Sequence, residues 1–239
     1  MHPLLRHLRE ETQRLLAVGG KGREENNGDA ASASGLWRGL ALLVLGTACY
    51  GASIGLWRAP QQALFVAIKM PLLILLTLFL NGLLNGMLAA IMGTGLGFAQ
   101  TMLAIGRSFA LFGLIVGALG PPAAFFTVTL PGWGEPGGFQ TYRVLLLAHT
   151  GVIAAGGVLA NWRLYRSLTP VCGRRAARRA LIAWLIGNLF VGAQLSYTLR
   201  PFFGNPDLPV QFLRPNAFQG NFYEAIWRLS RHAFDDLFR

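Results

Sequence analysis

The chain carries almost no negative charge through most of its length. Ten of its 239 residues are Asp or Glu, and the 177 residues from 30 to 206 contain a single carboxylate, that of Glu135. Charged residues make up 13% of the chain and apolar residues 53%, whereas soluble domains are about 25% charged. This composition excludes a soluble enzyme and a disordered tail, and the two cysteines exclude a disulfide scaffold. It indicates a helical membrane protein.

The apolar part of the chain is long enough to cross a bilayer five times. A helix rises about 1.5 Å per residue, so roughly 20 residues span a hydrocarbon core about 30 Å thick. The run from Met70 to Gly106 has 37 residues and must therefore turn, for which Gly93–Gly97 is the expected place. Gly120, Pro121 and Pro122 are expected to end the pass that follows. The predicted fold is an all-α polytopic membrane protein with transmembrane helices at about 39–57, 70–91, 100–120, 144–162 and 180–199.

Amphipathic helices are expected at both ends of this five-helix domain, which covers residues 36–200. Residues 1–17 place leucines along one helical stripe and arginines away from it, and a polar linker continues to residue 35. This pattern predicts a helix on the cytoplasmic membrane surface. Residues 201–239 form an irregular segment and then a second amphipathic helix, which begins at a capping box of Asn221 and Glu224.

Positive charge predicts the orientation of the chain. The loop expected from Arg163 to Arg179 holds six arginines and should be cytoplasmic, since basic loops stay inside. Five passes then put the N-terminus inside and the C-terminus outside. The net charge of +11 lies at the edges of apolar runs, so anionic lipid on the cytoplasmic side is the expected partner and nucleic acid is not. Lys69 should snorkel to the outer interface.

Four arginines stand on one face of the helix that leads into the fifth pass. They are a candidate patch for a lipid phosphate or an acidic partner, although ordinary topology determination explains them as well. These residues are Arg174, Arg175, Arg178 and Arg179.

Six polar side chains fall inside the predicted passes and form a candidate intramembrane polar seam. A polar group in a bilayer costs free energy when it has no hydrogen-bond partner. The seam is therefore either a path for a substrate or ion, or a set of hydrogen bonds that hold helices together. The Arg107 side chain is expected to face the bundle and to bond an asparagine or a carbonyl of the Gly93–Gly97 turn. The six residues are Asn81, Asn85, Arg107, His149, Asn188 and Gln194.

No constellation of residues indicates catalysis. The sequence offers no paired carboxylates, no arrangement typical of a Ser/His/Asp triad and no Cys/His metal spacing. The segment from Gly93 to Gly97 has two glycines of a dinucleotide fingerprint but lacks the third. We therefore expect no enzyme activity, no cofactor and no metal.

Three segments resemble an uncharacterised group of bacterial multi-pass membrane proteins. They are Gln194-Leu-Ser-Tyr-Thr-Leu-Arg-Pro-Phe-Phe-Gly-Asn-Pro206, Gly220-Asn-Phe-Tyr-Glu224 and Gly55-Leu-Trp-Arg-Ala-Pro60. The five-pass, N-inside layout is also distantly similar to the Yip family of trafficking membrane proteins, although the Tyr-Gly-Pro segment typical of that family is absent. The first resemblance implies a bacterial cytoplasmic (inner) membrane, and neither resemblance implies an activity.

Two function classes follow from these observations. The first is a non-enzymatic scaffold or accessory subunit of a membrane assembly, with membrane-protein partners or further copies of itself. It is favoured by the small-residue helix faces and by the amphipathic ends. The alternative is a transporter or channel for an ion or small solute that uses the polar seam.

Overall fold

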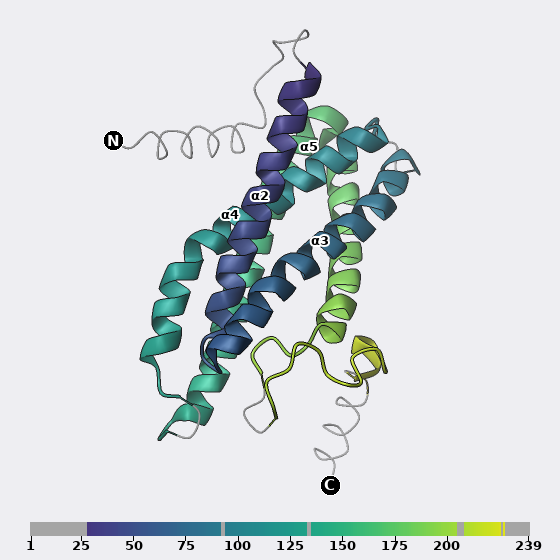
Figure 1. Ribbon diagram of the computed structural model, residues 1–239. Helices are drawn as coiled ribbons and strands as arrows, with labels where there is room; N and C mark the ends of the chain where they lie inside the picture. Colours follow the sequence, from purple (N-terminus) through teal and green to yellow (C-terminus); the bar gives the residue numbers. More distant parts are fainter. Residues whose placement is uncertain (1–27, 92–93, 133–134, 205–207, 226, 228–239) are drawn as a thin grey trace, which may run out of the picture.

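The chain is all-α in the residues that the computed structural model describes, which are 28–91, 94–132, 135–204, 208–225 and 227. Its long helices are α2 (Gly28–Gly55), α3 (Pro60–Ile91), α4 (Phe98–Thr129) and α5 (Gly138–Thr198) (Figure 1). The amphipathic helix predicted over residues 1–17 lies outside the described residues, as does most of the apolar stripe after Asn221. Each of these four helices is long and apolar enough to cross a membrane. The chain is therefore an integral membrane protein.

The turn between the second and third predicted passes is confirmed, but the passes are longer than predicted. Helix α3 ends at Ile91 and α4 begins at Phe98. Helix α4 then continues through Pro121 and Pro122 to Thr129, so the expectation that the prolines end this pass is wrong. Proline removes a hydrogen bond but keeps a helical φ, so a helix bends at it when its surroundings hold the next turns. The ribbon of α4 bends along its length (Figure 1).

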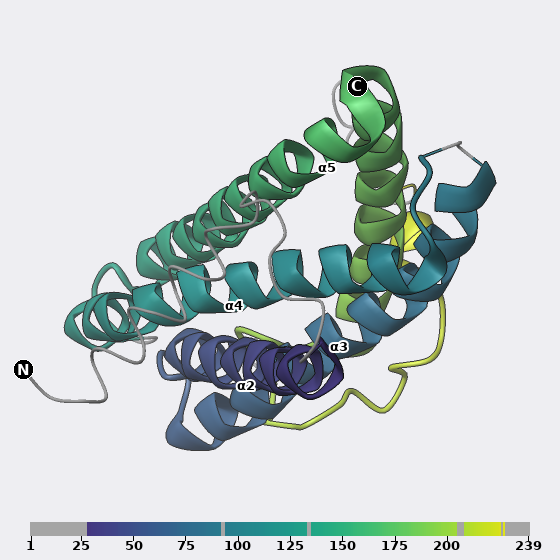
Figure 2. The same ribbon diagram turned by 90° about the horizontal axis from the view of Figure 1, so that it is seen from above.

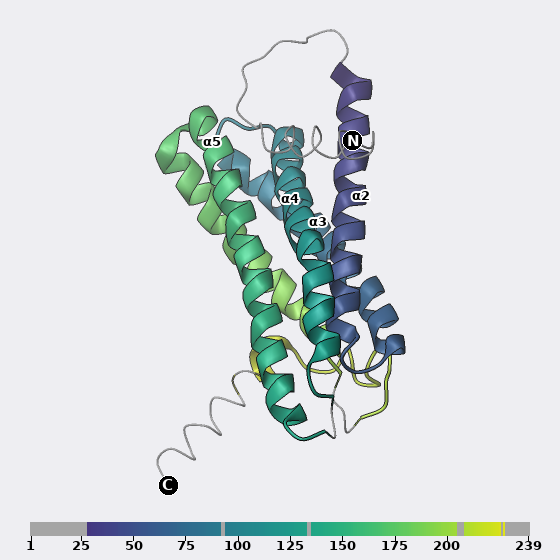
Figure 3. The same cartoon turned by 90° about the vertical axis from the view of Figure 1, so that its left-hand side faces the viewer.

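Helix α5 is two helical arms joined at Gly173. This residue has φ 79° and ψ 158°, a conformation open to glycine because it has no Cβ. Residues 138–172 form the first arm and residues 174–198 the second, and the two arms fold back toward one another (Figure 3). The prediction that residues 163–179 form a loop is therefore wrong. The chain reverses at one glycine, and the arginines on both sides of it stand on helices.

Helix α2 packs against both α3 and α4 (Figure 2). A Cβ added at Gly117 of α4 would lie 2.6 Å from the Cα of Gly46, and one added at Gly51 would lie 2.6 Å from the carbonyl oxygen of Val66 in α3. Real Cβ atoms essentially never come so close. The small residues on this face of α2 therefore let the helix backbones touch.

The two arms of α5 extend this three-helix unit. The first arm runs beside α4, where Gly156 faces Phe112 and Val116. The second arm crosses α3, where Gly187 meets Asn81 (Figures 2 and 3). Two apolar clusters result, one around Tyr50, Val66 and Phe112, and one around Ala89, Ile105 and Trp184.

The two ends of the bundle differ in charge. One end holds the turn before α4 and the reversal at Gly173, and we call it the arginine end. The other holds the loops after α2 and α4 and the segment after α5, and we call it the strap end. Between residues 35 and 227, both described carboxylates, Glu135 and Glu224, lie at the strap end, with five of the cationic side chains: Arg58, Lys69, Arg143, Arg200 and Arg214. The arginine end carries the other eight: Arg38, Arg107, Arg163, Arg166, Arg174, Arg175, Arg178 and Arg179.

Candidate functional site

Two of the six predicted seam residues face the second arm of α5 where it crosses α3, and a third stands beside this crossing on that arm. Asn81 and Asn85 stand four residues apart on α3 and are 0% and 1% exposed. A Cβ on Gly187 would lie 2.9 Å from Oδ1 of Asn81 and 3.9 Å from Oδ1 of Asn85, and Asn188 is the next residue of that arm. We call Asn81, Asn85 and Asn188 the asparagine seam.

Local sequence explains why the two α3 asparagines are buried together. Residues four apart share a helix face, so Asn81 and Asn85 point the same way. The glycines that follow them, Gly82 and Gly86, form the adjacent line and face Met102 and Phe98 of α4. One side of α3 therefore meets the second arm of α5, and the neighbouring side admits α4.

Many of the hydrogen-bond donors and acceptors of the asparagine seam have no partner within the described residues. Four of its buried side-chain atoms have no hydrogen-bond partner there: both Oδ1 and Nδ2 of Asn81, Nδ2 of Asn85 and Oδ1 of Asn188. One turn earlier on the second arm, the buried Nε1 of Trp184 also has no hydrogen-bond partner among the described residues. A buried polar atom left unpaired costs about 1–3 kcal/mol. The seam has donors and acceptors but no charge, so it suits a neutral hydrogen-bonding partner.

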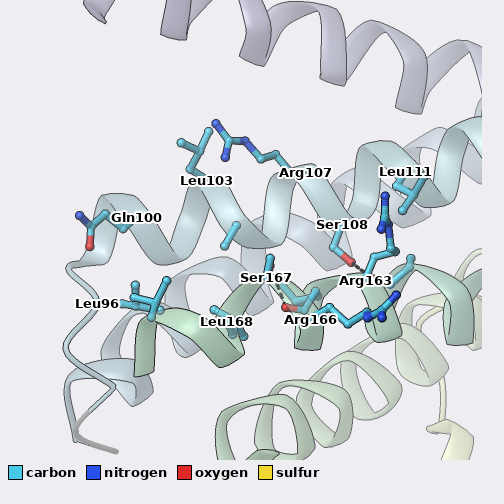
Figure 4. Close-up of a pocket in the computed structure, with 14 residues that line it drawn as sticks. Leu96, Gln100, Leu103, Arg107, Ser108, Leu111, Arg163, Arg166, Ser167 and Leu168 are labelled. Atoms are coloured by element: carbon cyan, nitrogen blue, oxygen red, sulfur yellow. Dashed lines mark hydrogen bonds between the residues drawn. The ribbon is translucent and has the colours of Figure 1, made fainter. Parts of the chain in front are cut away.

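The structure separates Arg107 from the asparagines. Its side chain is exposed, and it donates no hydrogen bond to a described asparagine. The expectation that it faces the bundle is wrong, and among the described residues it bonds neither an asparagine nor a carbonyl of the turn predicted at Gly93–Gly97. Asn81 and Asn85 point toward the second arm of α5, whereas Arg107 borders a groove between α4 and the first arm. Figure 4 shows its guanidinium extending along α4 toward Leu103.

His149 and Gln194 belong to two further places at the strap end. His149 is 4% exposed, its Nδ1 lies 2.9 Å from the Tyr50 hydroxyl, and its ring lies beside that of Phe203. Gln194 accepts a hydrogen bond from the backbone N–H of Phe222 at 3.0 Å. Each of these polar groups therefore has a defined local partner, and neither extends the asparagine seam.

The segment after α5 folds back over the strap end of the bundle, below the helices in Figure 1. We call residues 199–204, 208–225 and 227 the C-terminal strap. The ring of Tyr223 stacks on Phe190, and its hydroxyl bonds the Phe190 carbonyl at 2.9 Å. The cap predicted at Asn221 is confirmed, since its Oδ1 accepts from the Glu224 N–H at 2.7 Å.

Lys69 is the main polar residue that the sequence interpretation misplaced. It does not snorkel outward but is 0% exposed. Its Nζ donates to the Pro201 carbonyl at 2.9 Å and lies 5.0 Å from the centre of the Phe212 ring. Gln62, also 0% exposed, donates to the carbonyls of Pro201 and Phe202. The local sequence places Lys69 at the edge of an apolar run, and nothing there reveals that the distant strap covers it.

Two hollows border the first arm of α5. One, of about 720 Å³, lies beneath the strap and is mostly apolar, with Arg214 as the charged residue among those that line it. The other, of about 320 Å³, is the groove that Arg107 borders. We call it the arginine groove, because Arg163 and Arg166 line it from the first arm while Arg107 lines it from α4 (Figure 4).

The remaining predicted patch stands apart from both hollows. Its four arginines follow Gly173 on the second arm of α5 and are exposed: Arg174, Arg175, Arg178 and Arg179. Within the described residues, no group of three or more His, Cys, Asp or Glu side chains could hold a metal ion.

Comparisons with protein-family models, with curated proteins and with solved structures gave no match. The resemblances drawn from the sequence therefore stay predictions.

Proposed function

We propose that this chain is a five-pass protein of a bacterial cytoplasmic membrane and serves as a non-enzymatic accessory subunit of a membrane assembly. The fifth pass is supported by the division of α5 at Gly173. Its arms have 35 and 25 residues, which at about 1.5 Å per residue are roughly 52 Å and 37 Å long. Each arm is longer than the hydrocarbon core of about 30 Å.

The orientation is supported by the charge difference between the two ends. The arginine end carries eight of the thirteen described cationic side chains from residue 35 onward, and the strap end carries both carboxylates. Cytoplasmic segments are enriched in Lys and Arg. This distribution favours a cytoplasmic arginine end and an outer strap end, with the strap facing the outside.

The accessory role rests on the aromatic surface of the C-terminal strap. Phe218 and Trp227 are 84% and 66% exposed, although hydrogen bonds and ring stacking attach the strap around them to the bundle. Large exposed aromatic side chains on an attached segment are typical of interaction surfaces. We infer that these two side chains contact a partner protein at the strap end.

Cross-linking in native membranes tests this role. The full-length chain should form a cross-linked product with a partner protein, with a constant molar ratio of the two. The Phe218→Ala/Trp227→Ala variant should not form this product. A matched control, Phe125→Ala/Phe126→Ala, removes two aromatic side chains that are 62% and 60% exposed on α4 and should keep it. Equal cross-linking of both variants would contradict the proposal.

A second function, passage of a small neutral solute, is favoured by the unpaired atoms of the asparagine seam. A path for a solute needs hydrogen-bonding groups inside the bilayer, and these amides are buried there without described partners. Liposomes containing the protein should then swell in urea or glycerol gradients faster than protein-free liposomes. The Asn81→Leu/Asn85→Leu variant should abolish the difference, whereas Phe218→Ala/Trp227→Ala should not. Equal swelling with and without protein would rule this function out.

A further inference from the structure

The hollow beneath the C-terminal strap combines a large apolar interior with one charged group, and we call it the strap hollow. Its volume of about 720 Å³ falls within the range of roughly 300–1,000 Å³ that is typical of small-molecule sites. None of the described residues that line it is acidic. Apolar side chains of α3, the first arm of α5 and the strap make up much of the lining: Met70, Leu73, Ile74, Ile153, Phe202 and Phe203.

The charged group of the strap hollow is Arg214, which the strap contributes. Its side chain is half-buried, and it forms no hydrogen bond or ion pair with the described residues. Two of the lining hydroxyls are engaged, since Thr150 donates to the Leu146 carbonyl at 2.7 Å and Ser196 donates to the Ala193 carbonyl at 2.8 Å. A half-buried guanidinium without a counter-charge is stabilised by an anion that accepts its N–H groups. The hollow therefore suits a ligand with an anionic end and a long apolar part.

The strap hollow extends from the helix ends to a depth inside the bilayer core. Ile74 lies fourteen residues after the start of α3 at Pro60, and Ile153 lies fifteen residues after the start of α5 at Gly138. These separations are roughly 21 Å and 22 Å along the helix axes. Helix α3 and the first arm exceed a core of about 30 Å by roughly 9 Å and 11 Å at each end. Both isoleucines therefore lie about 11–12 Å inside the core, whereas Arg214 belongs to the strap, which lies at the helix ends (Figure 1).

The strap hollow is open beside the first arm of α5. Phe139 and Thr150 line it, and both side chains are exposed. They stand eleven residues apart on this arm, so the opening runs along roughly 16 Å of helix. With the first arm as a membrane pass, this opening faces lipid from the headgroup level into the core. An acyl chain can therefore enter the hollow sideways, without leaving the bilayer.

We propose that the strap hollow binds one molecule of an anionic phospholipid. The headgroup phosphate accepts hydrogen bonds from Arg214, because arginine forms strong bidentate hydrogen bonds with phosphate. One acyl chain lies in the hollow between α3 and the first arm of α5 and reaches Ile74 and Ile153, and the other chain stays in the bilayer. The lipid thereby joins the strap to two helices. This inference rests on the proposal that the first arm crosses the membrane, and it does not depend on the accessory role of the strap.

Lipid retention by the purified full chain tests the charged part of the site. The protein, delipidated in a neutral detergent, is titrated with phosphatidylglycerol or phosphatidylcholine and analysed by native mass spectrometry. We expect one phosphatidylglycerol per chain to be retained in preference to phosphatidylcholine, and Arg214→Gln should weaken this retention about tenfold. The control Arg143→Gln removes the same charge from an exposed residue at the strap end that does not line the hollow. It should bind the lipid like the unmodified chain.

Filling the hollow tests the part of the site that takes the acyl chain. Ile153→Trp places a larger side chain in the hollow and should weaken retention of phosphatidylglycerol several-fold. The control Leu147→Trp adds the same indole to the same arm, at a residue that is 72% exposed and does not line the hollow, and it should leave retention unchanged. If Ile153→Trp does not fold, Arg214→Gln provides the test, because this side chain bonds no described residue and its replacement should spare the fold.

Three results would overturn the proposal. Equal retention of the two lipids would show that the headgroup charge is not recognised. Equal retention by Arg214→Gln and Arg143→Gln would show that Arg214 does not hold the lipid. Displacement of phosphatidylglycerol by millimolar glycerol phosphate would show that the hollow recognises a free phosphate. These outcomes do not depend on the number of passes, which labelling of single cysteines measures separately.

Discussion

The polar residues of this protein are of two kinds. Some have hydrogen-bond partners within the described protein, and others have none there. Lys69 and Gln62 belong to the first kind, since both are fully buried and both donate to the strap. Arg107 belongs to the second, because its side chain is exposed beside the arginine groove. The sequence predicts that Lys69 lies at the outer interface and that Arg107 lies inside the third pass. It does not predict the partner of Lys69, because the one strap carbonyl that Lys69 bonds belongs to Pro201, which is 132 residues away in the chain.

The first prediction concerns attachment of the strap. Lys69→Met/Gln62→Met keeps both side chains long and unbranched but removes the donors to the carbonyls of Pro201 and Phe202. Buried carbonyls without donors cost about 1–3 kcal/mol each, so the strap should open more often. Hydrogen–deuterium exchange of backbone amides in residues 208–225 should become about tenfold faster or more.

Exposed Gln61 provides the control for this measurement. Gln61→Met changes the same residue type one position earlier and should leave the exchange of the strap unchanged. Unaltered exchange in the double variant would show that Lys69 and Gln62 do not hold the strap.

At the scale of elements, the sequence predicts the helices well and their ends poorly. Hydropathy runs identify every long helix, and the turn at Gly93–Gly97 follows from length alone. The predicted end at Pro121 and Pro122 is wrong because neighbouring helices hold the following turns of α4 in place. The loop predicted around Gly173 is wrong because a single glycine can reverse the chain, so the arginines on either side remain helical. Both errors in the predicted helix ends arise because tertiary contacts, which cannot be predicted from local composition, decide where a helix ends.

The second prediction tests the contact between α2 and α4. Gly46→Ala introduces a Cβ that collides with the Gly113 carbonyl on α4. Overpacking of this kind costs about 1–3 kcal/mol and should lower the thermal midpoint of the detergent-solubilised protein by several degrees. In Gly151→Ala the new methyl group meets nothing within 4 Å, and the gain in helix propensity is at most about 1 kcal/mol. The midpoint of this control should be unchanged or higher, and equal shifts in both variants would contradict close α2–α4 packing.

For the whole molecule, the number of times that α5 crosses the membrane decides on which side each loop lies. If each arm of α5 crosses the membrane, the loop before α5 and the strap after it lie on one side, and Gly173 lies on the other. If α5 crosses once, the loop and the strap lie on opposite sides. The sequence predicts five passes from the lengths of uncharged runs, and the break at Gly173 supplies the physical point at which the last two passes separate.

Labelling of single cysteines in intact cells distinguishes these topologies most directly. In a background with Cys49 and Cys172 replaced by serine, Glu135→Cys, Arg174→Cys and Phe218→Cys each place one thiol at an exposed position. We predict that a membrane-impermeant maleimide labels positions 135 and 218 from outside, and position 174 only after the cells are permeabilised. Labelling of positions 135 and 218 from opposite sides of the membrane would contradict the five-pass arrangement.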